Sequence, residues 1–151
     1  MTLLGQFCLW LALYAALWGA AVAFSGRWRQ RPDLAATVTR STYGLCAALV
    51  VAALCLWKGL FAHDFNIEYV AQYTARNLPD AYVFAAFWAG QKGSLLFWAS
   101  ILSVFGAIAQ TVTSRRHAEL LPYVAAVTNL VVAFFVITML FSANPFERLA
   151  F

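Results

Sequence analysis

The chain has 151 residues, of which 64% are hydrophobic and 11% are charged, and its formal net charge is +4. Soluble proteins average roughly 45–50% apolar and about 25% charged residues, because a globule must cover its outside with polar side chains. This composition excludes an ordinary soluble enzyme, a disordered chain and a nucleic-acid-binding domain. The three cysteines form no C-x-x-C pair, so neither a disulfide scaffold nor a zinc site is predicted.

Four uncharged runs predict an all-α integral membrane protein with a single membrane domain over residues 1–151. A helix needs about 20 largely apolar residues to cross about 30 Å of hydrocarbon. The runs place transmembrane helices at about 3–25, 42–62, 94–113 and 121–141. The first run could instead be a cleaved signal peptide. Signal peptides carry positive charge before the apolar stretch, however, and here the arginines follow it, so we favour a span.

The loop at 63–93, between the second and third spans, has structural signals of its own. Over residues 65–74, aromatic or apolar residues occupy every second position, and this period of two predicts an extended, half-buried strand. The run at 77–80 (NLPD) indicates a turn, with Asp80 as the cap of a following helix.

Residues 81–90 are too few to span a membrane and are rich in aromatic side chains, which predicts a helix in the membrane interface. Gly90 and Gly93 permit a sharp bend into the third span, which Ser94 can cap. One interpretation of the loop is a shaped aromatic surface that holds a flat apolar ligand or a partner protein. The other is an aromatic belt at the interface with a structured connector.

Charge placement predicts the orientation of the spans. The loops at 26–41 and 113–120 hold six basic and two acidic residues, whereas the rest of the chain holds four of each. Because cytoplasmic loops carry an excess of Lys and Arg, we expect these two loops in the cytoplasm. Both termini and the 63–93 loop are then expected on the extracytoplasmic, or periplasmic, side. The basic residues need no nucleic-acid partner to explain them.

Polar and small residues inside the third and fourth spans predict close helix packing. The polar ones are Gln110, Thr128, Asn129 and Thr138. A stripe of small residues at i+4 spacing runs along the third span: Ala99, Ser103 and Ala107. Small residues let helices approach closely, and polar side chains add hydrogen bonds between helices. A transport pathway is the alternative, which we disfavour because no intramembrane acid or base accompanies these residues.

Three patches of sequence resemble one known family in the same order. Residues 69–71 (YVA) and 78–82 (LPDAY) resemble its pattern Y-V-A…L-P-x-x-Y. Residues 87–98 (FWAGQKGSLLFW) resemble its signature W-[GA]-G-[HQ]-E-G-S-x-L-L-W, and residues 142–149 (SANPFERL) resemble its S-N-P-F-E-R-L stretch. These patterns are typical of the CcmF/NrfE-type haem lyase subunits of cytochrome c maturation, in the CcmF/CcmC/CcsA haem-handling superfamily.

The resemblance implies a role in attaching haem covalently to apocytochrome c outside the plasma (inner) membrane. In that family a haem chaperone delivers reduced haem, which is joined through thioether bonds to a C-x-x-C-H motif. The implied partners are therefore the haem chaperone, apocytochrome c and membrane lipid, with no nucleic acid. The cofactor-binding residues implied by the signature are Trp88, Gly90, Gln91, Gly93, Ser94 and Trp98.

The sequence departs from the family in two ways. Lys92 stands where the signature has Glu, which reverses a charge beside the glycines. Family members also continue into a tryptophan-rich W-x-W-D haem-handling loop and further spans with histidine ligands, which residues 1–151 do not contain. We therefore expect an amino-terminal piece of the lyase that acts as a scaffold and is not catalytic alone. The remaining part, with the tryptophan-rich loop, would be its partner.

No catalytic residue and no metal ligand is predicted. His63, at the outer end of the second span, could ligate haem iron, but a histidine that reaches to the interface is the favoured interpretation. His117 is expected to be solvated. The alternative function, based on the four-helix pattern alone, is a small structural membrane subunit of a transporter or respiratory complex.

Overall fold

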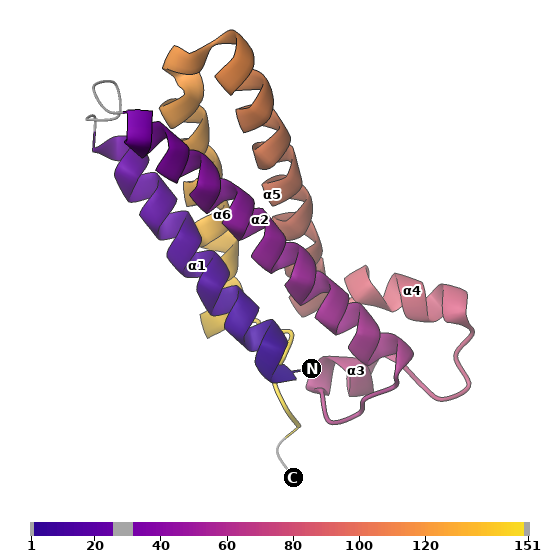
Figure 1. The fold of residues 1–151 in the computed structure, drawn as a ribbon. Coiled ribbons are helices and arrows are strands. Elements are labelled where there is room, and N and C mark those ends of the chain that lie inside the picture. Colours follow the sequence, from indigo (N-terminus) through magenta and orange to yellow (C-terminus); the bar gives the residue numbers. More distant parts are fainter. Residues whose placement is uncertain (1, 26–31, 150–151) are drawn as a thin grey trace.

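Four long helices form the body of the protein, and two short helices lie at one end of it (Figure 1). The computed structural model describes residues 2–25 and 32–149. Its elements in chain order are α1 (Thr2–Phe24), α2 (Pro32–Phe61), α3 (Glu68–Tyr73), α4 (Asp80–Ala89), α5 (Gln91–Arg116), the 3-10 helix η2 (Ala118–Leu120) and α6 (Leu121–Phe141). The described ranges contain no strand, so the predicted all-α class is confirmed.

The long helices α1, α2, α5 and α6 confirm the four predicted spans, because each is long and apolar enough to cross a membrane. The second helix begins at Pro32 and not at 42, so residues 32–41 are helix where a loop was predicted. Proline is tolerated in the first turn, and Thr39 keeps its hydroxyl satisfied inside the helix by donating to the carbonyl of Ala35 at 3.0 Å. The rest of the predicted loop, 26–31, lies outside the described residues.

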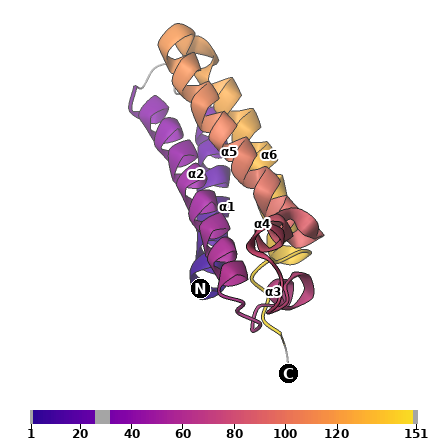
Figure 2. The ribbon, with the colours of Figure 1, turned by 90° about the vertical axis from the view of Figure 1, so that its right-hand side faces the viewer.

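The helices pack as a ring in which α1 contacts α2 and α6, while α5 contacts the same two helices from the other side (Figures 1 and 2). The predicted small-residue stripe of α5 is buried in this packing. A side-chain carbon added at the neighbouring Gly106 would collide with Thr128 of α6, which shows how closely α5 and α6 approach.

Two of the polar residues predicted to bond between spans, Gln110 and Asn129, do so, whereas Thr138 donates to the carbonyl of Phe134 in its own helix at 2.9 Å. Gln110 of α5 donates its Nε2 to the hydroxyl of Thr42 on α2 at 2.8 Å, and that hydroxyl donates to Oδ1 of Asn129 on α6 at 3.1 Å. All three side chains are fully buried. The Thr42 hydroxyl therefore joins three helices at one point, as expected of polar side chains in a span that lacks acids and bases.

The predicted strand at 65–74 is wrong. Residues 68–73 form the short helix α3, in which Glu68 accepts a hydrogen bond from Gln72 at 2.8 Å, one turn later. The adjacent residues Tyr69 and Val70 are both buried, which an alternating strand could not achieve. The extended pairing that does exist is a single antiparallel bridge between Ile67 and Arg148.

The helix predicted at 81–90 is present as α4, and its position in the membrane interface stays a prediction; the caps expected from Asp80 and Ser94 are not formed. Asp80 is the first residue of the helix, Pro79 occupies the cap position, and no side chain caps the end. Ser94 lies inside α5, which begins at Gln91, and its hydroxyl donates to the carbonyl of Trp88 at 2.7 Å. Ser94 thus ties α5 back to α4 across the bend at Gly90.

Candidate functional site

The three sequence patches, far apart in the chain, meet at one end of the bundle. They are α3, the bend between α4 and α5, and the extended segment at 142–149 that follows α6 (Figure 1). We call this region the outer junction, after the side of the membrane on which the sequence predicts it, and define it by residues 66–73, 86–94 and 142–149. Three tertiary interactions hold it together.

The first interaction is made by Tyr69 of α3, which lies buried beneath the bend. Its hydroxyl hydrogen points between two carbonyl acceptors, that of Ala86 at 2.9 Å and that of Phe87 at 3.2 Å. Its oxygen accepts from the backbone N–H of Gly90 at 3.0 Å. Burial raises the pKa of the Tyr69 phenol, so the group stays neutral and can both donate and accept. A side-chain carbon at Gly93 would collide with this hydroxyl and with the Phe87 carbonyl, so only glycine fits there.

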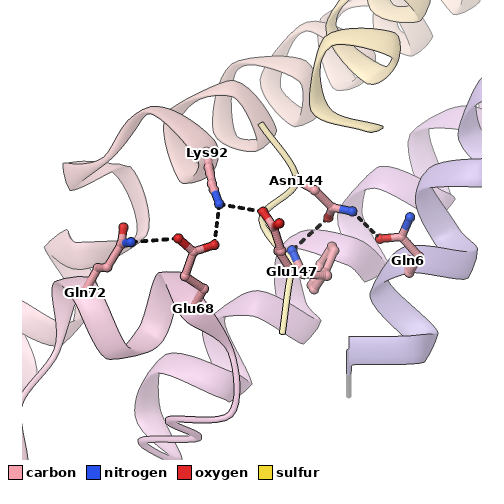
Figure 3. Close-up of polar contacts among 7 residues, drawn as sticks. Gln6, Glu68, Gln72, Lys92, Asn144 and Glu147 are labelled. Atoms are coloured by element: carbon pink, nitrogen blue, oxygen red, sulfur yellow. Dashed lines mark hydrogen bonds and ion pairs between the residues drawn. The ribbon is translucent and has the colours of Figure 1, made fainter. Parts of the chain in front are cut away.

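The second interaction is an ion-pair cluster centred on Lys92 (Figure 3). Its Nζ lies 2.7 Å from Glu68 Oε2 of α3 and 2.8 Å from Glu147 Oε2 of the segment at 142–149. The hydrogen bond from the Lys92 ammonium lowers the pKa of the Glu68 carboxyl. One ammonium therefore connects the first turn of α5 to both of the other patches.

The third interaction fixes the segment at 142–149 against the start of α1. Asn144 donates its Nδ2 to Oε1 of Gln6 at 2.7 Å (Figure 3). Arg148 donates to the hydroxyl of Thr2 at 3.1 Å. The ring of Phe146 is buried against Gly5, where a side-chain carbon would collide with it. The outer junction is thereby attached to the first helix as well.

A continuous aromatic surface lies beside the bend. Trp88 of α4 lies 5.7 Å from Phe97 of α5, measured between ring centroids, and Phe97 lies 5.6 Å from Trp98. Phe84 contacts Trp88 edge to face at 5.3 Å. We call these four residues the aromatic surface. Trp88 and Trp98 are 40% and 58% exposed, so the surface is open to a ligand, a partner or lipid.

Comparison with known proteins gives a consistent result over the whole chain. The cytochrome c-type biogenesis protein CcmF of Pseudomonas aeruginosa is 34% identical over 147 residues, which cover 97% of this chain and 22% of that protein. CcmF of Haemophilus influenzae is 30% identical over 145 residues, with shares of 96% and 22%. The solved structure of cytochrome c heme lyase CcmF superimposes with a TM-score of 0.87 at 26% identity, covering 99% of this chain and 25% of that one.

The chain is a homologue of the amino-terminal portion of the CcmF/NrfE proteins. No protein-family model matches it. The chain spans 22% of the length of the two CcmF relatives named above. Together with its four apolar helices, this homology makes it a multi-pass membrane protein.

The structure brings the predicted site residues of the CcmF/NrfE signature to one place but gives them different surroundings. Gly90 and Gly93 are buried within the bend, and Ser94 is half-buried and bonded to it. Gln91, Trp88 and Trp98 are exposed. The buried members shape the bend, whereas the exposed members could contact another molecule. Direct cofactor contact by any of them stays a prediction.

The described residues are better suited to stacking on the face of a haem ring than to ligating its iron. The contacting rings of the aromatic surface are inclined to one another by 37–86°, so one exposed indole, and not the whole surface, could stack on a flat apolar ring. No group of three His, Cys, Asp or Glu side chains that could hold a metal ion is found in residues 2–25 and 32–149. His63, just beyond α2, is half-buried with its backbone in the left-handed region at φ 48°, and its ring stacks on Phe65. Its Nδ1 is buried without a partner among the described residues, so it is not aimed at open space.

Sequence reasoning missed Tyr69, Glu68 and Glu147 as residues that build the site. The signal available was the equal number of acidic and basic residues outside the two basic loops. That balance is compatible with local pairing, but it does not say which acid meets Lys92. Only the convergence of the three patches supplies that information.

Proposed function

We propose that this chain forms the membrane-embedded amino-terminal part of a haem lyase that attaches haem to apocytochrome c. The observation that carries the proposal is the agreement with cytochrome c heme lyase CcmF over 99% of the chain at a TM-score of 0.87. In this proposal the chain contributes a scaffold, and the haem-handling region lies in the remaining part of the lyase. Haem chaperone and apocytochrome c are the other expected partners.

Within that scaffold, the outer junction holds the aromatic surface at a fixed place. Tyr69 and Gly93 set the angle between α4 and α5, and therefore the positions of Trp88 and Trp98. Haem, when bound to the complex, supplies the vinyl groups that become thioether bonds. The role proposed for Trp88 and Trp98 is to stack on an exposed face of the ring and exclude water from it.

The proposed orientation places the outer junction on the periplasmic side of the inner membrane. Arg115 and Arg116 end α5, and Arg40 lies near the start of α2, so the described basic excess is at the end of the bundle away from the outer junction. The positive-inside rule assigns that basic end to the cytoplasm. Both termini of the chain are then periplasmic, where haem attachment takes place.

The experiment is a deletion of this chain in its host, followed by staining of membrane proteins for covalent haem. We expect c-type cytochromes to be lost and to return when the intact chain is supplied. A chain with Trp88→Ala and Trp98→Ala should restore them incompletely. Trp10→Ala is the matched control, since Trp10 is similarly exposed at 49% but lies on α1, outside the aromatic surface. Unchanged cytochrome levels in the deletion strain would refute the proposal.

A further inference from the structure

A groove between α1 and α2 lies in the half of the bundle away from the outer junction. Its volume is about 290 Å³. Helix α1 supplies one wall through Leu11, Tyr14 and Trp18, and α2 supplies the other through Arg40, Ser41 and Gly44. The groove is therefore apolar along α1 and carries one cation, on α2.

The position of Arg40 along α2 places this cation at a membrane boundary. Seventeen uncharged residues, 41–57, separate it from Lys58. At 1.5 Å per residue they extend about 25 Å, close to the thickness of the hydrocarbon. Arg40 and Lys58, both exposed, thus lie at the two faces of the membrane. The groove runs from one headgroup region into the hydrocarbon.

The cation is available to a ligand. Among the described residues, the Arg40 guanidinium makes no hydrogen bond or ion pair. A guanidinium offers a fork of N–H donors that matches the oxygens of a phosphate. It lies on the more basic end of the protein, with Arg115 and Arg116 on α5. The field at this end therefore favours an anion over a neutral group.

The apolar part of the groove has room for a hydrocarbon chain. A side-chain carbon added at Gly44 would meet no atom within 4 Å, so the groove is open above this glycine. Tyr14 and Trp18 stack with their centroids 6.4 Å apart and their planes inclined by 9°, which makes one wall flat. These two residue types are favoured at the level of lipid headgroups.

We propose that this groove binds one anionic phospholipid. Its phosphate pairs with Arg40, and one acyl chain lies over Gly44 against Leu11 and the Tyr14–Trp18 wall. A zwitterionic lipid of the same chain length fits the apolar part equally well, but it gains less from the cation. The preference for the anionic headgroup therefore depends on Arg40, and the retention of any lipid depends on the open space at Gly44.

The test is native mass spectrometry of the full chain, released from detergent that contains equal amounts of phosphatidylglycerol and phosphatidylcholine with identical acyl chains. We expect the wild type to retain phosphatidylglycerol about fivefold over phosphatidylcholine, from the typical attraction of one basic residue for an anionic surface. Arg40→Gln should bring this ratio close to one. Arg115→Gln is the matched control: it removes one charge from the same end of the protein but outside the groove, so it should lower the ratio much less than Arg40→Gln does.

A second variant tests the groove itself. Gly44→Phe fills the open space, so it should fold normally, as far-ultraviolet circular dichroism can check, and lose adducts of both lipids. Inorganic phosphate added to the detergent should not compete, because it lacks the acyl chain. The proposal is overturned by equal retention of the two lipids by the wild type. It is also overturned by equal losses in the two arginine variants, or by undiminished lipid retention in Gly44→Phe.

Discussion

Reversing the charge of Lys92 tests whether its ion pairs hold the outer junction together. Lys92→Glu gives the residue that the CcmF/NrfE signature has at this position, so resemblance alone predicts a harmless change. The structure predicts the opposite, because Nζ of Lys92 lies 2.7 and 2.8 Å from the carboxylates of Glu68 and Glu147. The substitution would bring three carboxylates together with no cation between them.

The size of the expected loss of unfolding free energy follows from the solvent exposure of the three charged side chains. The side chains of Lys92, Glu68 and Glu147 are 22%, 31% and 57% exposed, so solvent screens both pairs. Pairs of this kind contribute about 0.5–1 kcal/mol each. Lys92→Met should therefore cost about 1–2 kcal/mol of unfolding free energy. Lys92→Glu adds repulsion between like charges, for a total of about 2–3 kcal/mol.

The assay is thermal unfolding of the purified chain in detergent, carried out as a double-mutant cycle. The exchanged variant, Glu68→Lys with Lys92→Glu, restores an opposite charge at the same contact and should recover at least half of the loss. Lys58→Glu is the matched control: it makes the same change of charge at an exposed lysine with no ion pair among the described residues. High salt should narrow all of these differences.

Two results would refute this account of the outer junction. One is a Lys92→Glu variant that is no less stable than Lys58→Glu. The other is an exchanged variant that is as unstable as Lys92→Glu alone, since the coupling between positions 68 and 92 would then be absent. If the lyase proposal also holds, Lys92→Glu should lower covalent haem attachment, and the exchange should restore it.

Three further predictions concern stability. The Lys92 ammonium lowers the pKa of Glu68 from its usual 4.5, so the ion pair adds to the free energy of unfolding above about pH 4.5 and this contribution is lost as the pH falls below it. In melting curves at pH 7, 5, 4 and 3, the melting temperature of Lys92→Met should therefore fall less with acid than that of the wild type. Tyr69→Phe removes the hydroxyl that bonds the Gly90 N–H and the Ala86 carbonyl, so the free energy of unfolding should fall by about 1–3 kcal/mol in thermal unfolding. A variant as stable as the wild type would contradict this role of the hydroxyl. Gln110→Leu should lower the free energy of unfolding by only about 0.6 kcal/mol, which is the average for a hydrogen bond between helices in a membrane. A decrease as large as that of Tyr69→Phe would contradict this prediction.

The membrane spans could be predicted because their cause is local. A run of uncharged residues must form a helix in hydrocarbon, where each backbone group needs a partner within its own segment. Residues 121–141 therefore agree with α6 to the residue. The start of α2 could not be predicted in the same way. Outside the hydrocarbon, a helix at 32–41 and a polar loop have similar composition. The choice between them depends on hydrogen bonds such as that from the Thr39 hydroxyl to the Ala35 carbonyl.

The error at 65–74 has a different cause. A strand needs a partner strand, and the described chain offers this region only the bridge from Ile67 to Arg148. The alternating pattern contains a helical pair: Tyr69 and Tyr73, four residues apart on α3, have ring centroids 4.7 Å apart, and both rings lie against the glycines of the α4–α5 bend. Periodicity describes one segment, but burial in this loop is decided by a helix some twenty residues further on.

The same distinction explains what Lys92 means. As a sequence feature it is a departure from a signature that reverses a charge beside the glycines. In the structure it lies between acids from two other patches, one in α3 and one after α6. The charge at position 92 therefore cannot be judged within the signature alone, because its electrostatic surroundings are supplied by residues 68 and 147. A lysine there pairs with both acids of this outer junction. Because the family's S-N-P-F-E-R-L stretch keeps a glutamate at position 147, we expect a glutamate at position 92 to need its compensating change at position 68.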